Sequence, residues 1–304
     1  MIYDYVIAGA GPAGCICAAG LKRKNLSVRI LEKNFPGYRK VCGDGIGFAC
    51  VQTLEDIGFP MDALTDAGAV KIKQFIHYID GKKYTDILSN HNKRAFGMPR
   101  DAFDGMLQEY VSGTLGIPID YGVNVRDIHT VDGGFDVCGI TAKKVVIAAG
   151  AGAAIRFDGK TLVQPSRENP VGISAAVRAP AAAEPFFMFD YQKQYDGAYG
   201  WIFSVGDGEY NVGLWLNHDK KRLKKLFYQF METRGREYLG DHIEWIREPR
   251  GALMGIGERR ISPCEGIALI GDAANTSNHR DGEGISRAIM DAENFIGRLE
   301  RTRG

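Results

Sequence analysis

Residues 3–14 read Tyr-Asp-Tyr-Val-Ile-Ala-Gly-Ala-Gly-Pro-Ala-Gly, an apolar run that passes directly into a GxGxxG motif. We expect a helix over 15–24 after the motif, and then a second apolar strand over 27–31 that ends beside Glu32. This order of strand, glycine turn, helix, strand and acid is typical of a Rossmann unit. Glu32 lies 18 residues after the last motif glycine, where a carboxylate accepts hydrogen bonds from ribose hydroxyls. The stretch therefore predicts a dinucleotide-binding unit.

The three motif glycines, Gly9, Gly11 and Gly14, have different expected roles. They allow a tight turn, access of a pyrophosphate to the backbone, and close packing of the helix on the strand. The start of the helix offers free N–H groups and a positive dipole end to the phosphates. The motif by itself does not distinguish FAD from NAD.

Composition narrows the class of protein. The 304 residues carry a net charge of +1, so bulk charge gives no sign of a nucleic-acid partner. Glycine accounts for 39 residues, which indicates many tight turns and close backbone approaches. The six cysteines include no CxxC pair, and we expect no metal site. Without an apparent signal peptide or an apolar run long enough to cross a bilayer, the sequence predicts a cytoplasmic protein with reduced thiols.

The rest of the chain predicts a second, antiparallel sheet. Residues 71–93 alternate apolar and polar side chains around Asp80-Gly81, which is typical of a hairpin. An aromatic-rich series of short strands follows, over 171–178, 186–191, 200–204 and 210–216. We expect this sheet to line an apolar pocket. A helix over 219–231 carries an apolar face that packs on the sheet or, alternatively, lies on a membrane.

Four segments together resemble the geranylgeranyl reductase family of FAD enzymes, which share the p-hydroxybenzoate hydroxylase fold. They are GAGPAG at 9–14, KVCGDGIG at 40–47, AYGWIFSVGDGEYNVGL at 198–214 and IGDAANTSNHRDGEGI at 270–285. The resemblance covers essentially the whole chain. It implies an α/β fold in which a Rossmann-type FAD-binding domain carries an inserted antiparallel-sheet substrate domain. We expect residues 1–70, 94–158 and 261–304 to form the discontinuous FAD-binding domain, and residues 71–93 and 159–260 to form the substrate domain.

The motif and the resemblance together imply a set of FAD-contacting residues. Arg100 is expected to meet the pyrophosphate or the adenosine part, and Asp272 the ribityl chain. The full set is Gly9, Gly11, Ala13, Gly14, Glu32, Cys42, Gly43, Gly45, Arg100, Val125, Gly271, Asp272, Gly284 and Ile285.

Two residues are candidates for catalysis. By the resemblance, Cys42 lies near the flavin ring, where its thiol would supply a proton or tune the ring; alternatively it is a small residue that packs a tight turn. His279 stands in the loop after Asp272, as a proton donor or as a solvated loop residue. The family's usual Ala-Asp-Gly reads Ala148-Ala149-Gly150 here, which argues against hydroxylase-style use of NADPH.

The resemblance implies an oxidoreductase that reduces C=C bonds of a hydrophobic, isoprenoid-like substrate by hydride transfer from reduced FAD. Its partners would be a small hydrophobic or aromatic substrate and an external electron donor, either NAD(P)H or a ferredoxin, and a peripheral membrane contact stays open. Two alternatives remain. One is a monooxygenase or halogenase on the same fold, although the run from Trp201 to Phe203 lacks the Trp-x-Trp-x-Ile-Pro pattern of halogenases. The other is a flavin-binding protein without turnover.

Overall fold

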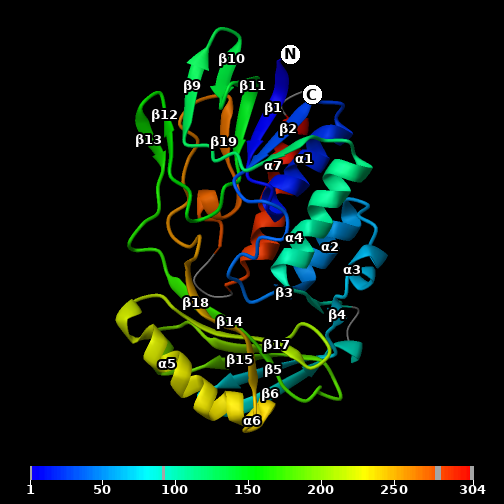
Figure 1. The fold of residues 1–304 in the computed structure, drawn as a ribbon, viewed down its shortest axis with the longest axis vertical. Coiled ribbons are helices and arrows are strands. Elements are labelled where there is room, and N and C mark those ends of the chain that lie inside the picture. The colour runs from blue at the N-terminus through cyan, green and yellow to red at the C-terminus, as the bar shows by residue number, and fades with distance from the viewer. Residues whose placement is uncertain (1, 91–92, 278–281, 302–304) are drawn as a thin grey trace.

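The computed structural model describes residues 2–90, 93–277 and 282–301. Figure 1 shows a large lobe of mixed helices and strands above a small lobe built on a second sheet. The helices are α1 (Pro12–Arg23), α2 (Phe48–Asp56), α3 (Asp62–Asp66), α4 (Arg100–Glu109), α5 (Leu223–Phe230), α6 (Arg236–Leu239) and α7 (Gly284–Arg301). Among the described residues, no helix is both long and apolar enough to cross a membrane.

The large lobe is organised by a sheet of nine strands among the described residues, ordered β13-β12-β9-β10-β11-β1-β2-β8, with β19 paired to β11. Strands β8, β2, β1, β11 and β19 run parallel to one another, as the Rossmann prediction requires. The strands are β1 (Tyr3–Ala8), β2 (Val28–Glu32), β8 (Ile119–Tyr121), β9 (Asp127–Val131), β10 (Gly134–Val137), β11 (Ile140–Ile147), β12 (Ile155–Phe157), β13 (Lys160–Val163) and β19 (Ile267–Leu269).

Helices α1, α2, α4 and α7 cover one face of this sheet (Figure 1). Helix α1 is buried along most of its length, and it packs on α7 so closely that a Cβ at Gly20 would lie 2.6 Å from Ile296 Cγ1. The two helices therefore meet at a position where only glycine leaves room for the partner side chain.

The small lobe contains a mainly antiparallel sheet of seven strands in the described chain, ordered β18-β14-β17-β16-β15-β5-β6. The strands are β5 (Gln74–Ile79), β6 (Lys82–Ile87), β14 (Val171–Arg178), β15 (Phe186–Tyr191), β16 (Gly200–Ser204), β17 (Glu209–Leu216) and β18 (Glu244–Leu253). A short three-stranded sheet, β3 (Gly45–Ile46), β7 (Phe96–Gly97) and β4 (Val70–Lys71), lies between the two larger ones. The expected sheet is therefore present, with β18 as an additional edge strand.

The structure shows which way the amphipathic helix predicted over 219–231 faces. Its apolar residues Leu223, Leu226, Phe227 and Phe230 are buried against the seven-stranded sheet, and Lys224 and Lys225 are exposed. The apolar face is therefore occupied by packing on the sheet rather than free for a membrane. The helix is shorter than predicted, because a 3₁₀ turn precedes it and a π-helical turn, Met231–Gly235, follows it.

The structure differs from the expected boundaries in one further place. Strand β13 pairs with β12 in the nine-stranded sheet, so the chain leaves this sheet later than the predicted domain boundary at residue 158. Strand β9 begins at Asp127, and the Val123 N–H before it bonds the carbonyl of Glu32 at the end of β2. Residues 123–126 consequently line the cavity described below.

Candidate active site

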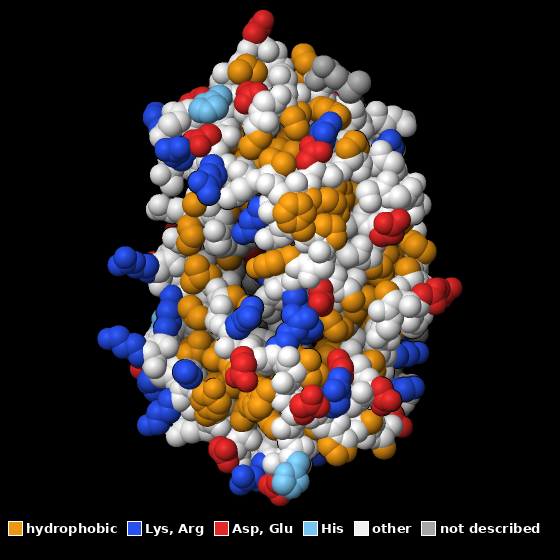
Figure 2. Space-filling view, viewed as in Figure 1, with side chains coloured by type: hydrophobic (Ala, Val, Ile, Leu, Met, Phe, Trp, Pro, Cys, Tyr) orange, Lys and Arg blue, Asp and Glu red, His pale blue; other side chains and the backbone are white. Residues whose placement is uncertain are grey.

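A continuous cavity of ≈ 890 Å³ runs between the two lobes. In Figure 2 this face of the molecule is hollowed at its centre, and Lys and Arg side chains gather beside the hollow. The upper wall comes from the loops that follow β1, β2 and β11, and the lower wall comes from the seven-stranded sheet. The volume lies in the range of cavities that bind cofactors and drug-sized ligands.

The glycine turn after β1 forms the deepest part of the upper wall. Gly9 has φ +108°, and a Cβ there would lie 2.6 Å from the carbonyl oxygen of Ala148, so this turn requires glycine. A Cβ at Gly14 would lie 1.9 Å from the oxygen of Gly9, which explains the close packing of α1 on the turn. A Cβ at Gly11 would meet no atom within 4 Å, and Gly11 lines the cavity. The space in front of Gly11 is therefore kept open for something other than protein.

Glu32 ends β2 and lines the same wall. Its Oε2 accepts a hydrogen bond of 2.8 Å from the Ala10 N–H, and its Oε1 accepts two of 2.9 Å from the N–H and the side-chain amide of Asn34. These bonds fix the carboxylate beside the glycine turn and leave lone pairs for hydroxyl donors. The arrangement fits the ribose-binding role that its spacing predicts.

Asp272 follows β19 and forms an ion pair of 2.8 Å with Lys40. Burial would raise the pKa of Asp272, but the ion pair with Lys40, the charge of Arg100 and a hydrogen bond from Ser277 together hold it below its usual value. The neighbouring Gly271 does not line the cavity; its N–H donates to the buried carboxylate of Asp291 on α7, and this bond fixes the loop. Lys40 therefore places a cation in the cavity wall where the sequence prediction named only Asp272.

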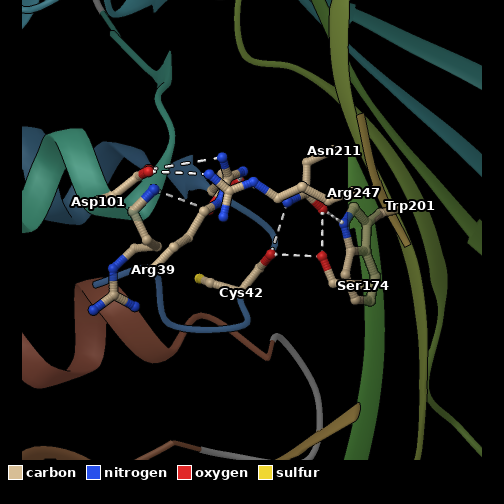
Figure 3. Close-up of polar contacts among 9 residues, drawn as sticks. Arg39, Cys42, Asp101, Ser174, Trp201, Asn211 and Arg247 are labelled. Carbon is tan, nitrogen blue, oxygen red and sulfur yellow. Dashed lines mark hydrogen bonds and ion pairs between the residues drawn. The ribbon is translucent and has the colours of Figure 1, made fainter. Parts of the chain in front are cut away.

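The loop over residues 39–44 is the seam between the two walls (Figure 3). The carbonyl of Cys42 accepts hydrogen bonds from the Ser174 hydroxyl at 2.9 Å and from Asn211 Nδ2 at 2.8 Å. Both donors belong to the seven-stranded sheet. The sheet therefore holds the backbone of Cys42 and leaves the thiol free to point elsewhere.

Asp44 is buried at the end of the loop over residues 39–44 and connects several residues around it. It is 0% exposed, pairs with Arg39, and accepts hydrogen bonds from Asn211 Nδ2 at 2.7 Å and from the Arg100 N–H at 3.2 Å. Burial raises the pKa of Asp44 to about 6, although Arg39 and Asn211 oppose the rise. Because the Arg100 N–H belongs to the first turn of α4, Asp44 also caps this helix from another segment.

Arg100 lines the cavity but is held by groups of the protein. Its guanidinium makes two hydrogen bonds with Asp104, of 2.9 and 2.8 Å, and Cys42 lies near enough to interact with it electrostatically. Burial would lower the pKa of Arg100, but Asp104 and Cys42 raise it above its ordinary value, so the side chain stays charged. The expected contact of Arg100 with a pyrophosphate or adenosine remains a prediction. In the structure, its side chain interacts with Asp104 and Cys42.

The lower wall is aromatic. Phe75 stacks on Phe48 at 4.9 Å, and the ring centroids of Phe187 and Phe203 lie 4.3 Å apart. Further rings from β15, β16, β17 and the loop before β16 complete the surface: Phe189, Tyr199, Trp201 and Trp215. A Cβ at Gly213 would lie 2.1 Å from Cζ2 of Trp201, so a glycine inside β17 makes room for this indole. Rings on one sheet face, over a cavity, suit an apolar ligand.

The structure brings together nearly all of the predicted cofactor residues. Apart from Gly14 and Gly271, which support the wall from behind, they line one cavity: Gly9, Gly11, Ala13, Glu32, Cys42, Gly43, Gly45, Arg100, Val125, Asp272, Gly284 and Ile285. His279 lies outside the described residues. Sequence reasoning missed Lys40, Asp44, Ser174 and Asn211 as site residues, although all but Ser174 stand inside the quoted motif segments.

The cavity fits FAD. It is long enough to pass from Glu32 through the open space at Gly11 to the loop that begins α7 at Gly284. When FAD is bound, Glu32 would meet the ribose of the adenosine half and the N-terminus of α1 the pyrophosphate. The other half would then lie between the Cys42 loop and the start of α7.

Comparison with known proteins supports this interpretation. No protein-family model matches the chain. Digeranylgeranylglycerophospholipid reductase 1 of Methanococcoides burtonii is 28% identical over 320 residues, covering 98% of this chain and 74% of that protein. Menaquinone reductase of Mycolicibacterium smegmatis is 27% identical over 321 residues, covering 94% of this chain and 73% of that protein.

Among solved structures, a geranylgeranyl bacteriochlorophyll reductase-like protein from Thermoplasma acidophilum superposes with a TM-score of 0.79 at 20% identity, covering 99% of this chain and 79% of that one. The chain is an FAD-dependent oxidoreductase that is similar to geranylgeranyl reductases. The flavin-dependent brominase Bmp2 also superposes, with a TM-score of 0.77 at 18% identity over 99% of this chain and 79% of that one. The fold is therefore shared between reductases and halogenases, and the choice between them depends on the site.

The predicted fold class, cofactor and enzyme class agree with the comparisons. The relatives carry the names of reductases, which agrees with the predicted reductase rather than with either of the two alternatives left open by the sequence.

Proposed function

We propose that this chain reduces a carbon–carbon double bond in a hydrophobic, isoprenoid-bearing molecule. The observation that carries the proposal is the pairing of the two walls in one cavity, with bare glycine backbone on one side and aromatic rings on the other. A glycine-lined wall suits a cofactor with a pyrophosphate, and an aromatic wall suits an apolar substrate laid across it. The names of the relatives, which act on digeranylgeranylglycerophospholipid and menaquinone, support the same substrate class.

FAD, when bound and reduced, supplies the hydride for this chemistry. The protein's own part is to orient the double bond, exclude water and provide the proton. The aromatic wall orients the apolar substrate and keeps the site dry. Cys42 Sγ holds the proton that reaches the second carbon of the double bond, and water then returns a proton to the sulfur.

The atoms and electrons of one turnover balance when one external electron donor takes part. The alkene gains a hydride and a proton and becomes an alkane unit, while the cofactor loses two electrons and a proton. A donor such as NAD(P)H or a ferredoxin restores the reduced cofactor. Arg100, held charged by Asp104 beside the Cys42 thiol, stabilises negative charge left on the sulfur after the proton departs.

The test is an anaerobic half-reaction. The FAD-loaded protein is reduced with dithionite and mixed in a stopped-flow instrument with a geranylgeranyl lipid, with menaquinone, or with O₂. We expect reoxidation of the flavin by at least one of the two isoprenoid compounds, together with a product heavier by two hydrogens. Rapid reaction with O₂ and a hydroperoxyflavin absorbance, without alkene reduction, would instead support a monooxygenase or halogenase. Slow reoxidation by all three would support a flavin-binding protein without turnover.

A further inference from the structure

Asn211 lies at the centre of β17, 2% exposed, with its side chain directed toward the Cys42 loop (Figure 3). Its Nδ2 donates one hydrogen bond to the Cys42 carbonyl at 2.8 Å and another to Asp44 Oδ2 at 2.7 Å. Its Oδ1 accepts a bond of 2.8 Å from the indole N–H of Trp201 and lies 3.0 Å from the Ser174 hydroxyl. Both amide hydrogens and the amide oxygen are therefore engaged, which fixes the orientation of this side chain.

The partners of Asn211 belong to the two walls of the cavity. Trp201 and Ser174 stand on strands of the seven-stranded sheet, whereas Cys42 and Asp44 belong to the loop that leads into β3. The loop has no regular secondary structure before Gly45, and Asp44 has φ +61°. A loop of this kind takes its position from side-chain contacts rather than from a backbone ladder. Asn211 supplies two of those contacts with a single amide group.

The loop in turn determines where the thiol of Cys42 lies. The Cys42 carbonyl is held by Asn211 and Ser174, and Cys42 interacts electrostatically with the guanidinium of Arg100. Asp44 joins the same unit, because it accepts the Arg100 N–H and pairs with Arg39. Removing the Asn211 amide would therefore take one hydrogen bond from the Cys42 carbonyl and one from Asp44 at the same time.

We propose that Asn211 is a positioning residue that holds the Cys42 thiol at the cofactor face of the cavity. By holding Cys42, Asn211 supports the proton-transfer step of the proposed function. This part of the inference rests on that function. Misplacing a reacting group by about 1 Å can lower a rate on the order of 10²-fold. We therefore expect the rate of substrate reduction to fall by about this factor when the loop is no longer fixed. The sequence carries Asn211 inside the stretch at 198–214, but its spacing from Cys42 gives no sign of the contact.

The first test measures the loop directly and needs no substrate. FAD-loaded Asn211→Ala and wild type are treated with iodoacetamide, and alkylation of Cys42 is followed by peptide mass spectrometry, with the exposed Cys138 and Cys264 as internal references. We expect Cys42 to react about tenfold faster in the variant, the factor given by losing a hydrogen bond, with FAD content retained and the flavin absorbance shifted. Equal alkylation rates and identical flavin spectra in folded, FAD-loaded protein would overturn the proposal.

Two further variants serve as control and as a milder change. Asn217→Ala removes another buried asparagine near the end of β17, whose Nδ2 bonds the carbonyl of Asp196 away from the cavity, and we expect wild-type alkylation of Cys42. Trp201→Phe keeps an aromatic ring but removes the N–H that Asn211 accepts, and we expect a smaller acceleration. If Asn211→Ala does not fold, Trp201→Phe is the test of the proposal. An unchanged alkylation rate of Cys42 in this variant would count against the positioning role of Asn211.

A second test separates this inference from the proposed function. Single-turnover reduction of substrate is measured for Asn211→Ala, Cys42→Ala and the double variant. We expect Asn211→Ala to lower the rate about 10²-fold alone and by less than about threefold when Cys42 is already alanine. Additive effects would overturn the route through Cys42. If the wild type reduces no alkene while the alkylation result stands, the positioning of Cys42 is upheld and the proposed function fails.

Discussion

The two walls of the cavity are built in opposite ways. The cofactor wall is mostly backbone: Gly9, Gly11 and the other glycines expose peptide groups, and a side chain at Gly11 would enter empty space. The substrate wall is made of side chains, with rings such as Phe187 and Phe203 packed against each other on a sheet. A backbone wall recognises what many proteins share, a pyrophosphate and a ribose, whereas a side-chain wall can change with each substrate.

The largest expected effect tests the backbone wall. Gly11→Val places two methyl groups where the pyrophosphate would lie, and we expect FAD binding to be lost. The free protein should fold normally, because Gly11 has φ −78° and no atom lies within 4 Å of its Cβ position. Flavin content of the purified variant gives the measurement. Gly297→Val, at an equally open position on α7 outside the cavity, is the control and should stay yellow. FAD rather than FMN should be released from the wild type.

The next effect tests the seam between the walls. Cys42→Ala should lower the rate of substrate reduction on the order of 10²–10⁴-fold, the usual range for a proton-transfer group, and leave FAD affinity nearly unchanged. The backbone of Cys42 is held through its carbonyl, which alanine keeps. Flavin affinity and single-turnover reoxidation are measured in the same preparation, with the exposed Cys264→Ala as control. A variant that binds FAD and turns over like the wild type would make Cys42 a packing residue.

Asp44 makes the seam dependent on pH. The unfolded chain releases this proton near pH 4, but burial raises the folded pKa to about 6, so the folded state binds the extra proton between these values. The contribution of Asp44 to the free energy of unfolding therefore falls as pH rises from about 4 to about 6, by up to ~3 kcal/mol, and is constant above. Asp44→Asn should remove this slope.

Urea unfolding of both proteins at several pH values between 4 and 7 measures the slope. Asp132→Asn, at an exposed turn between β9 and β10, is the control and should behave as the wild type does. Parallel pH profiles for wild type and Asp44→Asn would contradict the assignment.

The smallest expected effect tests the side-chain wall. Phe189→Leu removes one ring that packs edge-on against Phe203 at 5.0 Å and lines the cavity. Losing part of one aromatic contact costs about 1 kcal/mol, so KM should rise about fivefold while kcat changes little. Phe157→Leu, on β12 outside the cavity, provides the control. A large fall in kcat with unchanged KM would assign Phe189 to the chemistry instead of to substrate binding.

The same contrast explains what the sequence could predict. The glycine turn, Glu32 and the strands of the nucleotide unit follow from local spacing, and β14, β15 and β16 have the predicted bounds because short apolar, aromatic-rich runs mark buried strands. Strand β18 was missed because its charged sequence, Glu244–Leu253, lies at an exposed sheet edge and shows no apolar alternation.

The contacts at the seam could not be predicted in the same way. Asn211 and Cys42 stand 169 residues apart and meet only because two sheets face one another across the cavity. No local pattern encodes this distance. Helix α2, Phe48–Asp56, was also missed, since it is short and begins without a side-chain cap.

The packing of α1 on α7 has a consequence for the order of assembly. Gly20 near the beginning of the chain faces Ile296 near residue 300, and β1 joins β19 through β11. During synthesis, the strands of the small lobe, through β18, leave the ribosome before α7 does, so they can pair first. The large lobe closes only when distant segments meet, a step that long loop closure makes slow. Because Gly284 and Ile285 of α7 line the cavity, its wall is complete only after α7 has packed on α1.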